Sequence, residues 1–255
     1  MKKTPETVRR IRILGSPVDM VSADEAMTTF AELMETEGCS QIVTPNSEIL
    51  WSASKDPVLK AIISGAELVL PDGIGLVYAS RLLGVPLRER VTGIDFLSRI
   101  LAWLSENGKS VYFLGSAPGV AEKAAENMRA RFPALKTAGT RNGYFGPEEE
   151  AGIVAEINAS GADFLCVAMG SPRQERFISA HKAEFTARLA IGVGGSLDIW
   201  AGTLKRAPLF FRKHGIEWLY RLAQQPRRIG RMAVLPLFML RVLFYAPGGK
   251  KREGT

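Results

Sequence analysis

The chain is 255 residues long, and its 46% hydrophobic and 23% charged residues are ordinary for a globular protein with one large α/β domain, alone or with an appendage. Its two cysteines form no CxxC motif and indicate buried, reduced thiols, while its two histidines exclude a histidine-rich metal site. The net charge of +7 is concentrated in residues 203–255, which hold 12 lysines and arginines but only two glutamates, and this favours an anionic partner such as a membrane or a nucleic acid.

The N-terminal part begins an alternation of strands and helices. Its first basic residues are not followed by an apolar segment with a cleavage site, so we expect no signal peptide and a cytoplasmic location. The apolar run at 10–14 predicts a first strand. Ser22 and Glu25 then form a capping box for a helix that ends near Glu37, and Asp56-Pro57 begins a further helix.

Five apolar runs along the chain each end in a small polar cluster. They cover 41–46, 67–75, 111–119, 164–175 and 189–198. Short aliphatic runs without alternation are typical of parallel strands that are buried on both faces. Between and beside these runs, helical patterns cover 74–83, 95–107, 118–132, 147–159 and 172–184. The alternation predicts an α/β fold, a Rossmann-like doubly wound and mostly parallel sheet over residues 1–204. The loop 140–147, rich in Gly, Asn and aromatic residues, predicts a turn or a lid.

The composition changes near Gly202, and residues 205–255 predict a basic, apolar helical appendage. Its longest uninterrupted apolar run, 232–240, contains Pro236 and is too short to span a membrane. Cations mixed with Trp, Phe and Leu favour a helix that lies in the headgroup region of an anionic membrane. The alternative is a helical hairpin packed on the domain or in an oligomer interface. A nucleic acid is disfavoured, because the cations stand beside a block of Leu, Met and Phe.

Four polar side chains follow strand ends and are expected along one rim, because ligands of open α/β sheets bind beyond the carboxyl ends of the strands. They are Asn46, Asp72, Gln174 and Asp198. Asp72 has the chemistry of a general base, but it also suits the N-cap of the helix that starts at Gly73. Asn46 could orient a hydroxyl or a phosphate, or cap the helix that follows it.

Other residues suit the recognition of phosphate. Arg90 has the planar fork that binds phosphate oxygens, although a plain surface arginine is the alternative. The segment 171–175 opens a helix, where free N–H groups favour anions, and Gln174 offers both a donor and an acceptor. The glycine loop 192–198 resembles a phosphate-cradling loop but lacks the G-x-G-x-x-G pattern. Asp198 could accept bonds from a ribose or a base, or cap a turn.

Several motifs are absent from the sequence: GxxxxGK[ST], GxSxG, HExxH and D-x-D. The missing D-x-D argues against a metal that bridges a nucleotide diphosphate, so the prediction includes neither a metal nor a cofactor. Arginines and helix N-termini would then have to stabilise a leaving diphosphate.

Seven motifs, in their order and spacing, resemble the WecG/TagA/CpsF glycosyltransferases (glycosyltransferase family 26). They are VTPNSEIL (43–50), LVLPDGIGLVYASRLLG (68–84), ERVTGIDF (89–96), GSPRQE (170–175), IGVGGSLDIWAG (191–202), RAP (206–208) and GIEWLYRL (215–222). The resemblance implies an inverting, metal-independent enzyme that moves a hexose or N-acetylhexosamine from a UDP-sugar to a polyprenyl-diphosphate-linked sugar. It leaves N-acetylmannosamine, its uronic acid and glucose open as the transferred sugar. It also implies a peripheral protein on the cytoplasmic membrane face and suggests a homo-oligomer.

The resemblance assigns a role to each candidate residue. Asp72 becomes the catalytic base, and Thr44 and Asn46 lie near the acceptor or the transferred sugar. Arg90 lies near the substrate phosphates and Gln174 near the donor. The nucleotide is expected at Gly194, Gly195 and Asp198, and the appendage contributes Arg221, Arg227 and Arg228, with Arg231 next. Two other interpretations stay open: a Rossmann-like oxidoreductase that binds NAD, and a non-catalytic scaffold at the membrane.

Overall fold

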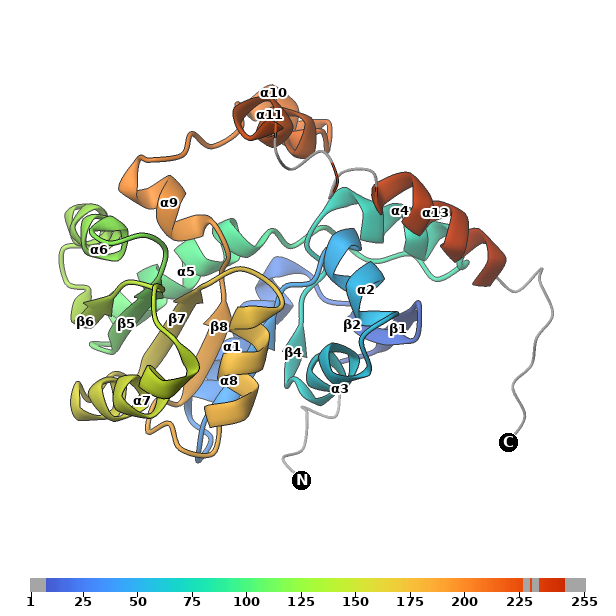
Figure 1. Cartoon of the computed structure of the whole chain (residues 1–255). Coiled ribbons are helices and arrows are strands. Elements are labelled where there is room, and N and C mark those ends of the chain that lie inside the picture. The colour runs from blue at the N-terminus through green and yellow to red at the C-terminus, as the bar shows by residue number, and fades with distance from the viewer. Residues whose placement is uncertain (1–7, 227–229, 231–233, 246–255) are drawn as a thin grey trace.

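A six-stranded parallel sheet forms the centre of the molecule, as the sequence predicts (Figure 1). The computed structural model describes residues 8–226, 230 and 234–245. The strand order is β4-β3-β8-β7-β5-β6. In chain order the strands are β3 (Ser40–Val43), β4 (Leu68–Val69), β5 (Ser110–Gly115), β6 (Lys136–Arg141), β7 (Phe164–Ala168) and β8 (Leu189–Gly192). Each of the five predicted apolar runs supplies one strand, and every residue of β3, β7 and β8 is buried.

Strand β6 has no counterpart in the prediction. It pairs with β5 at the edge of the sheet, and its residues are exposed or half-buried. Its sequence, KTAGTR, has no apolar run, because an edge strand with one covered face does not need one. The half-exposed edge therefore leaves too weak a pattern for the strand to be recognised.

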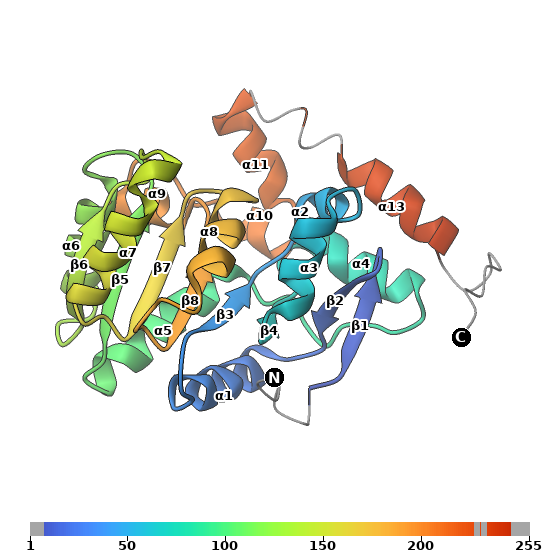
Figure 2. The ribbon, with the colours of Figure 1, turned by 60° about the horizontal axis from the view of Figure 1, so that its bottom comes forward.

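Helices cover both faces of the sheet, which makes the fold doubly wound (Figure 2). One face carries α1 (Ala23–Met34), α5 (Gly93–Glu106) and α6 (Val120–Arg131), and the other carries α3 (Pro57–Gly65), α7 (Glu150–Ala159) and α8 (Arg173–His181). Side chains alternate between the faces, so Phe113 of β5 packs among α1, α5 and α6, while Leu114 packs against α7 and α8. The capping box of Ser22 and Glu25 begins α1 as predicted.

The first predicted strand exists, but it does not belong to the parallel sheet. Strands β1 (Arg10–Ile13) and β2 (Ser16–Asp19) form a separate antiparallel hairpin. The two turn residues, Leu14 and Gly15, both have positive φ angles of 51° and 80°, as a tight two-residue hairpin requires. Arg10 Nε donates to Asp19 Oδ1 at 2.6 Å, and Val69 N donates to Asp19 Oδ2 at 2.7 Å, so a buried carboxylate joins the hairpin to β4.

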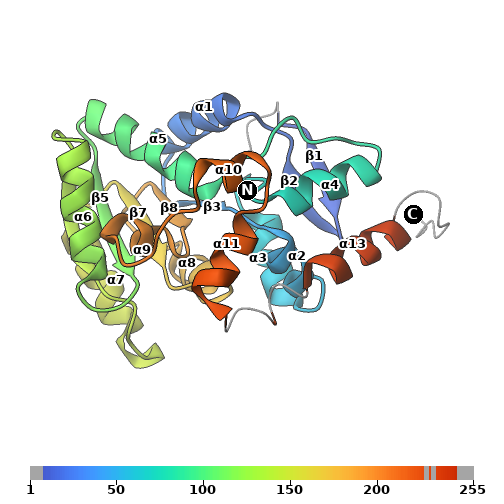
Figure 3. The ribbon, with the colours of Figure 1, turned by 90° about the horizontal axis from the view of Figure 1, so that it is seen from above.

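The remaining helices surround the carboxyl edge of the sheet and its β4 side. They are α2 (Ser47–Ala53), α4 (Ile74–Leu82), the 3-10 turn η1 (Pro147–Glu149), α9 (Ser196–Ala201), α10 (Leu209–Lys213), α11 (Glu217–Gln224) and α13 (Val234–Tyr245). Seen from above, α10 and α11 cross the middle of the molecule, while α13 lies beside α2 and α4 (Figure 3). The C-terminal residues thus form helices as predicted, although the domain boundary at 204/205 stays a prediction.

Helix α13 packs on the domain with one face and exposes the other. Phe238 and Val242 are fully buried in the apolar cluster shared by the hairpin, α2, α3 and α4. Leu237, Leu240 and Phe244 point outward and are 50%, 53% and 74% exposed. Within the described part of the chain, no helix is both long and apolar enough to cross a membrane. Packing on the domain, the alternative left open by the sequence, therefore describes the inner face of α13, while its outer face is exposed.

Two phenylalanines of α13 give a matched test of this packing. Phe238→Ala should destabilise the fold by about 3 to 5 kcal/mol, because it leaves a cavity in a closed core. Phe244→Ala, on the exposed face of the same helix, should change the free energy of unfolding by no more than about 0.5 kcal/mol. Urea unfolding measures both, and equal losses for the two variants would contradict the described docking of α13.

Candidate active site

Two pockets lie at the carboxyl edge of the sheet and share a wall. The larger has a volume of about 1340 Å³ and the smaller of about 270 Å³. Gly170, Gly194 and Gly195 line both of them. They come from the loops after β7 and β8, two central neighbouring strands. A single ligand with a bulky and a compact part can therefore extend across this wall.

Asp72 lines the smaller pocket, three residues after the end of the short strand β4. The expected alternative, an N-cap for α4, is wrong: Gly73 occupies that position with φ of +95°, and the turn directs the carboxylate elsewhere. Asp72 Oδ2 accepts from the backbone N–H of Gly93, the first residue of α5, at 3.2 Å. A Cβ atom at position 93 would stand 3.3 Å from this oxygen, so glycine lets the carboxylate approach the helix.

The surroundings of Asp72 raise its pKa to about 6. Burial is the main cause, because the enclosing protein replaces water around the charged form. The N–H of Gly93 and the charges of Arg221 and Arg90 oppose this rise, whereas the charge of Glu217 adds to it. A carboxylate with this pKa is ionised at neutral pH and takes up a proton more readily than a free aspartate.

The C-terminal helix α11 closes the smaller pocket. Glu217, Trp218 and Arg221 all line it, and Glu217 forms an ion pair with Arg90 in which Nη2 and Oε2 are 2.9 Å apart. Gly215, with φ of +70°, precedes α11 and packs so closely on Ile74 that a Cβ atom would lie 2.8 Å from it. Arg221 is thus in the predicted place, whereas Arg90 acts on Asp72 from beside the pocket and faces a carboxylate.

Thr44 and Asn46 follow β3 and line the same pocket, as predicted. Thr44 Oγ1 is 3.4 Å from the carbonyl oxygen of Gly192, which it meets across the β3–β8 pair. Asn46 Oδ1 accepts from Ile49 N at 3.0 Å, so the capping alternative is confirmed for this residue. Its side chain still borders the pocket and is held in one position by the cap.

Gln174 is almost fully buried, with 3% of its surface exposed, and it supports the shared wall. Its Oε1 accepts from Gly194 N at 3.0 Å, and its Nε2 donates to Glu175 Oε1 at 2.8 Å. A Cβ atom at position 192 would collide with its amide at 2.5 Å, which explains a glycine there. The residue lies at the predicted rim, but its bonds go to the protein.

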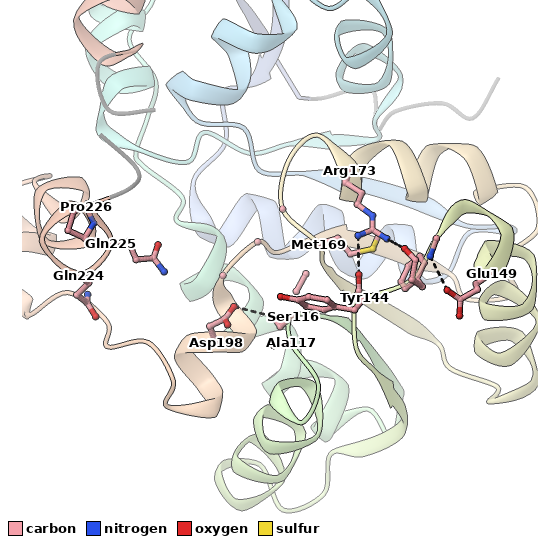
Figure 4. Close-up of a pocket in the computed structure, with 17 residues that line it drawn as sticks. Ser116, Ala117, Tyr144, Glu149, Met169, Arg173, Asp198, Gln224, Gln225 and Pro226 are labelled. Atoms are coloured by element: carbon pink, nitrogen blue, oxygen red, sulfur yellow. Dashed lines mark hydrogen bonds between the residues drawn. The ribbon is translucent and has the colours of Figure 1, made fainter. Parts of the chain in front are cut away.

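The larger pocket brings together Asp198 and residues that the sequence did not single out (Figure 4). Ser116 Oγ donates to Asp198 Oδ2 at 3.1 Å. The ring of Tyr144 is 75% exposed and lies on the side of the pocket that faces these two residues. Arg173 fixes the loop by donating to the carbonyl oxygens of Gly143 at 3.0 Å and Phe145 at 2.7 Å. Residues 143–146 of the predicted loop therefore form a pocket wall, and the aromatic residues among them were the available signal.

Arg227 and Arg228, like Arg231, lie outside the described residues. Residues 224–226, at the end of α11, border the larger pocket and lead directly into that segment. Among the residues that the structure describes, no group of three or more His, Cys, Asp or Glu could hold a metal ion. Independence from metal stays a prediction.

Comparison with known proteins identifies the family. Residues 11–252 match the glycosyl transferase WecG/TagA/CpsF family. The chain belongs to this family. A relative from Bacillus spizizenii is 38% identical over 237 residues, 91% of either chain, and one from Staphylococcus aureus (strain MRSA252) is 36% identical over 236 residues, 91% of this chain and 92% of the relative. Both are named N-acetylglucosaminyldiphosphoundecaprenol N-acetyl-beta-D-mannosaminyltransferase. The resemblance inferred from the motifs is confirmed, and the protein is a glycosyltransferase.

The charges around Asp72 can be tested directly. Arg221→Met should raise the pKa of Asp72 above about 6 because a neighbouring cation is lost, and Glu217→Gln should lower it because a like charge is lost. Arg221→Lys keeps the charge and serves as the control. Carbon-detected NMR titration of the carboxyl groups measures all three, and shifts in the same direction for the first two variants would contradict the arrangement.

Proposed function

We propose that this glycosyltransferase moves N-acetylmannosamine from its UDP derivative to the N-acetylglucosamine of a polyprenyl-diphosphate carrier. The observation that carries the proposal is Asp72, an enclosed carboxylate with a pKa of about 6, in a small pocket that shares a glycine wall with a large one. The names of the relatives support the choice of both sugars.

The larger pocket suits the nucleotide. Tyr144 offers an exposed aromatic face on which a uracil ring can stack. Asp198 already accepts the Ser116 hydroxyl and has further acceptor capacity for ribose hydroxyls. Gly194, with φ of +50°, and Gly195 would let the diphosphate pass close to the backbone between the two pockets. The transferred sugar would then lie in the smaller pocket beside Asp72.

The reaction is a single displacement. Asp72 removes the proton from an acceptor hydroxyl, and that oxygen attacks the anomeric carbon of the donor sugar. A bond from the acceptor oxygen to the anomeric carbon forms as the bond to the UDP oxygen breaks on the opposite face, so the configuration is inverted. UDP leaves with the bonding electrons, and the proton stays on Asp72 until solvent takes it.

Cations must stabilise the charge that develops on the leaving diphosphate. Arg221 is the candidate within the smaller pocket, and Arg90, which pairs with Glu217, is the candidate beside it. Pro226 lies at the rim of the larger pocket, and Arg227 and Arg228 are the next two residues in the sequence. We therefore keep these two arginines as candidates. This division gives the α/β domain the base and gives the C-terminal segment much of the positive charge.

The acceptor is bound to lipid, so the enzyme must work at a membrane surface. Helices α10, α11 and α13 carry a set of exposed large apolar side chains: Leu209, Phe210, Leu219, Leu237, Leu240, Leu243 and Phe244. In Figure 1, α10 and α11 lie at the top of the molecule, above the carboxyl edge of the sheet, and α13 lies to the right beside α4. Apolar side chains among cations favour the interface of an anionic bilayer. We therefore propose peripheral binding to the inner face of the cell membrane, while self-association stays a prediction.

The activity is tested with a panel of UDP-sugars and a short polyprenyl-diphosphate-GlcNAc acceptor, with release of UDP as the signal. UDP-N-acetylmannosamine should give the fastest release, and turnover should rise as the pH increases through about 6, where Asp72 loses its proton. Asp72→Asn should reduce kcat by roughly a hundredfold or more while the Kd for UDP changes little, because the base acts only in the transition state.

Other results of this assay would decide against the proposal. Unchanged turnover in Asp72→Asn would exclude the assigned base. Folded protein that releases UDP from no donor but binds vesicles would support a non-catalytic scaffold, and binding of NAD in place of UDP would support an oxidoreductase. A faster reaction with UDP-glucose or a UDP-uronic acid would correct the sugar and leave the reaction class in place.

Membrane binding is tested on vesicles of phosphatidylglycerol and phosphatidylethanolamine. Replacing Leu237, Leu240 and Phe244 together by Ser should weaken co-sedimentation by roughly tenfold or more, because three exposed apolar side chains of α13 are lost. Val58→Ser is the control, since Val58 is 57% exposed on α3, away from these helices. Equal binding by the triple variant and the wild type would show that this face does not contact lipid.

A further inference from the structure

Glu175 is a buried acidic residue that the reaction above does not use. It lies in the first turn of α8, with only 2% of its surface exposed. Burial raises its pKa, although hydrogen bonds from the side chains of Gln174 and Ser171 oppose this effect. Its Oε1 accepts from Gln174 Nε2 at 2.8 Å. Burying an acidic side chain costs free energy of folding, and a role in holding Gln174 would offset this cost.

The side-chain amide of Gln174 could take two orientations, and the observed one supports the wall between the two pockets. Its oxygen must face the N–H of Gly194, and its nitrogen must then face away. A carboxylate at 175 accepts the nitrogen end and would repel the oxygen end. Glu175 thereby excludes the flipped amide, in which the nitrogen would meet the Gly194 N–H and two donors would oppose each other.

The backbone on both sides of this contact is tightly fitted. Gly192 leaves no room for a Cβ atom against the Gln174 amide, and Gly194 is in the left-handed region with φ of +50°. Gln41 Nε2 donates to the carbonyl oxygen of Glu175 at 3.2 Å, which joins the start of α8 to strand β3. The chain of contacts from Glu175 through Gln174 to Gly194 thus ends on a residue that lines both pockets.

We propose that Glu175 is a positioning residue: its carboxylate fixes the Gln174 amide, which holds the Gly194 wall at the place where the donor diphosphate crosses between the two pockets. This inference rests on the proposed function for the identity of the donor, and on the contacts alone for the wall. In this arrangement Gln174, which was expected near the donor, supports the donor site through its bond to Gly194.

A reciprocal exchange of the two side chains tests the proposal, because Gln and Glu have nearly the same volume. In Gln174→Glu, two carboxylates face each other, and we expect the KM for the UDP-sugar to rise by roughly tenfold or more. In Glu175→Gln, an amide oxygen can still accept from Gln174, so the loss should be small. In the double variant Q174E/E175Q, the new amide at 175 donates to the new carboxylate at 174, which still accepts from Gly194 N, so KM should return to within about threefold of the wild type.

A double variant that does not recover would overturn the proposal. If the two side chains only fill space, or if the Gln174 amide contacts the donor directly, the loss in the double variant will equal the product of the two single losses or exceed it, which overturns the proposal. Asp163→Asn is the control for carboxylate loss elsewhere: Asp163 accepts from Ser110 N at 2.8 Å at the start of β5, so its loss should lower Tm without a change in KM.

Thermal unfolding of the same four proteins separates this inference from the proposed function. If the wild type releases no UDP from any donor, the proposed function fails, and recovery of Tm in the double variant still decides whether Glu175 orients Gln174. If Gln174→Glu does not fold, folding of the double variant counts as the recovery. Failure of both to fold, or additive losses of Tm, would overturn the inference.

Discussion

The parallel pairing of β3 with β8 is the constraint on which the site depends. Thr44 and Gly192 are 148 residues apart in the sequence, yet the pairing leaves Thr44 Oγ1 3.4 Å from the Gly192 carbonyl oxygen. Because both strands are fully buried, a shift of the register would carry apolar side chains out of the core. The loops after these strands are therefore fixed relative to each other, and both line the smaller pocket.

A second constraint comes from the start of α5, which receives the Asp72 carboxylate. The loop from Gly73 to Thr92 leaves the sheet, forms α4 and returns so that Gly93 N donates to Asp72 Oδ2. The positive end of the α5 dipole stabilises the charged carboxylate, while burial favours the neutral acid. The balance keeps the group near its point of titration, a property that neither the helix nor the enclosure would give alone.

Local sequence patterns predicted most of the fold, and the reasons for the failures are physical. Fully buried strands need continuous apolar runs, so five of the six parallel strands were predicted, whereas the half-exposed β6 gave no signal. The sequence allowed both Asn46 and Asp72 to cap a helix, but only Asn46 does so in the structure. Gly73 takes the N-cap position of α4 with a positive φ angle, which the preceding residues do not predict. Glu217 and Tyr144 were not predicted, because their contribution depends on where distant segments pack. Asp72, Thr44, Asn46 and Arg221 line the smaller pocket as the motifs implied.

The inner face of α13 is synthesised late, yet it covers apolar segments that are synthesised early. Phe238 and Val242 complete an apolar cluster whose other members come from the first third of the chain, including Leu50, Leu59 and Leu76. During synthesis, those early segments emerge long before α13 exists, so their apolar surface has no cover until residues 234–245 have been made. A ribosome that stops before codon 234 would release a chain with this surface open, and chaperones or proteases that bind exposed apolar segments would recognise it. Burial of this early surface therefore depends on a helix that is made much later.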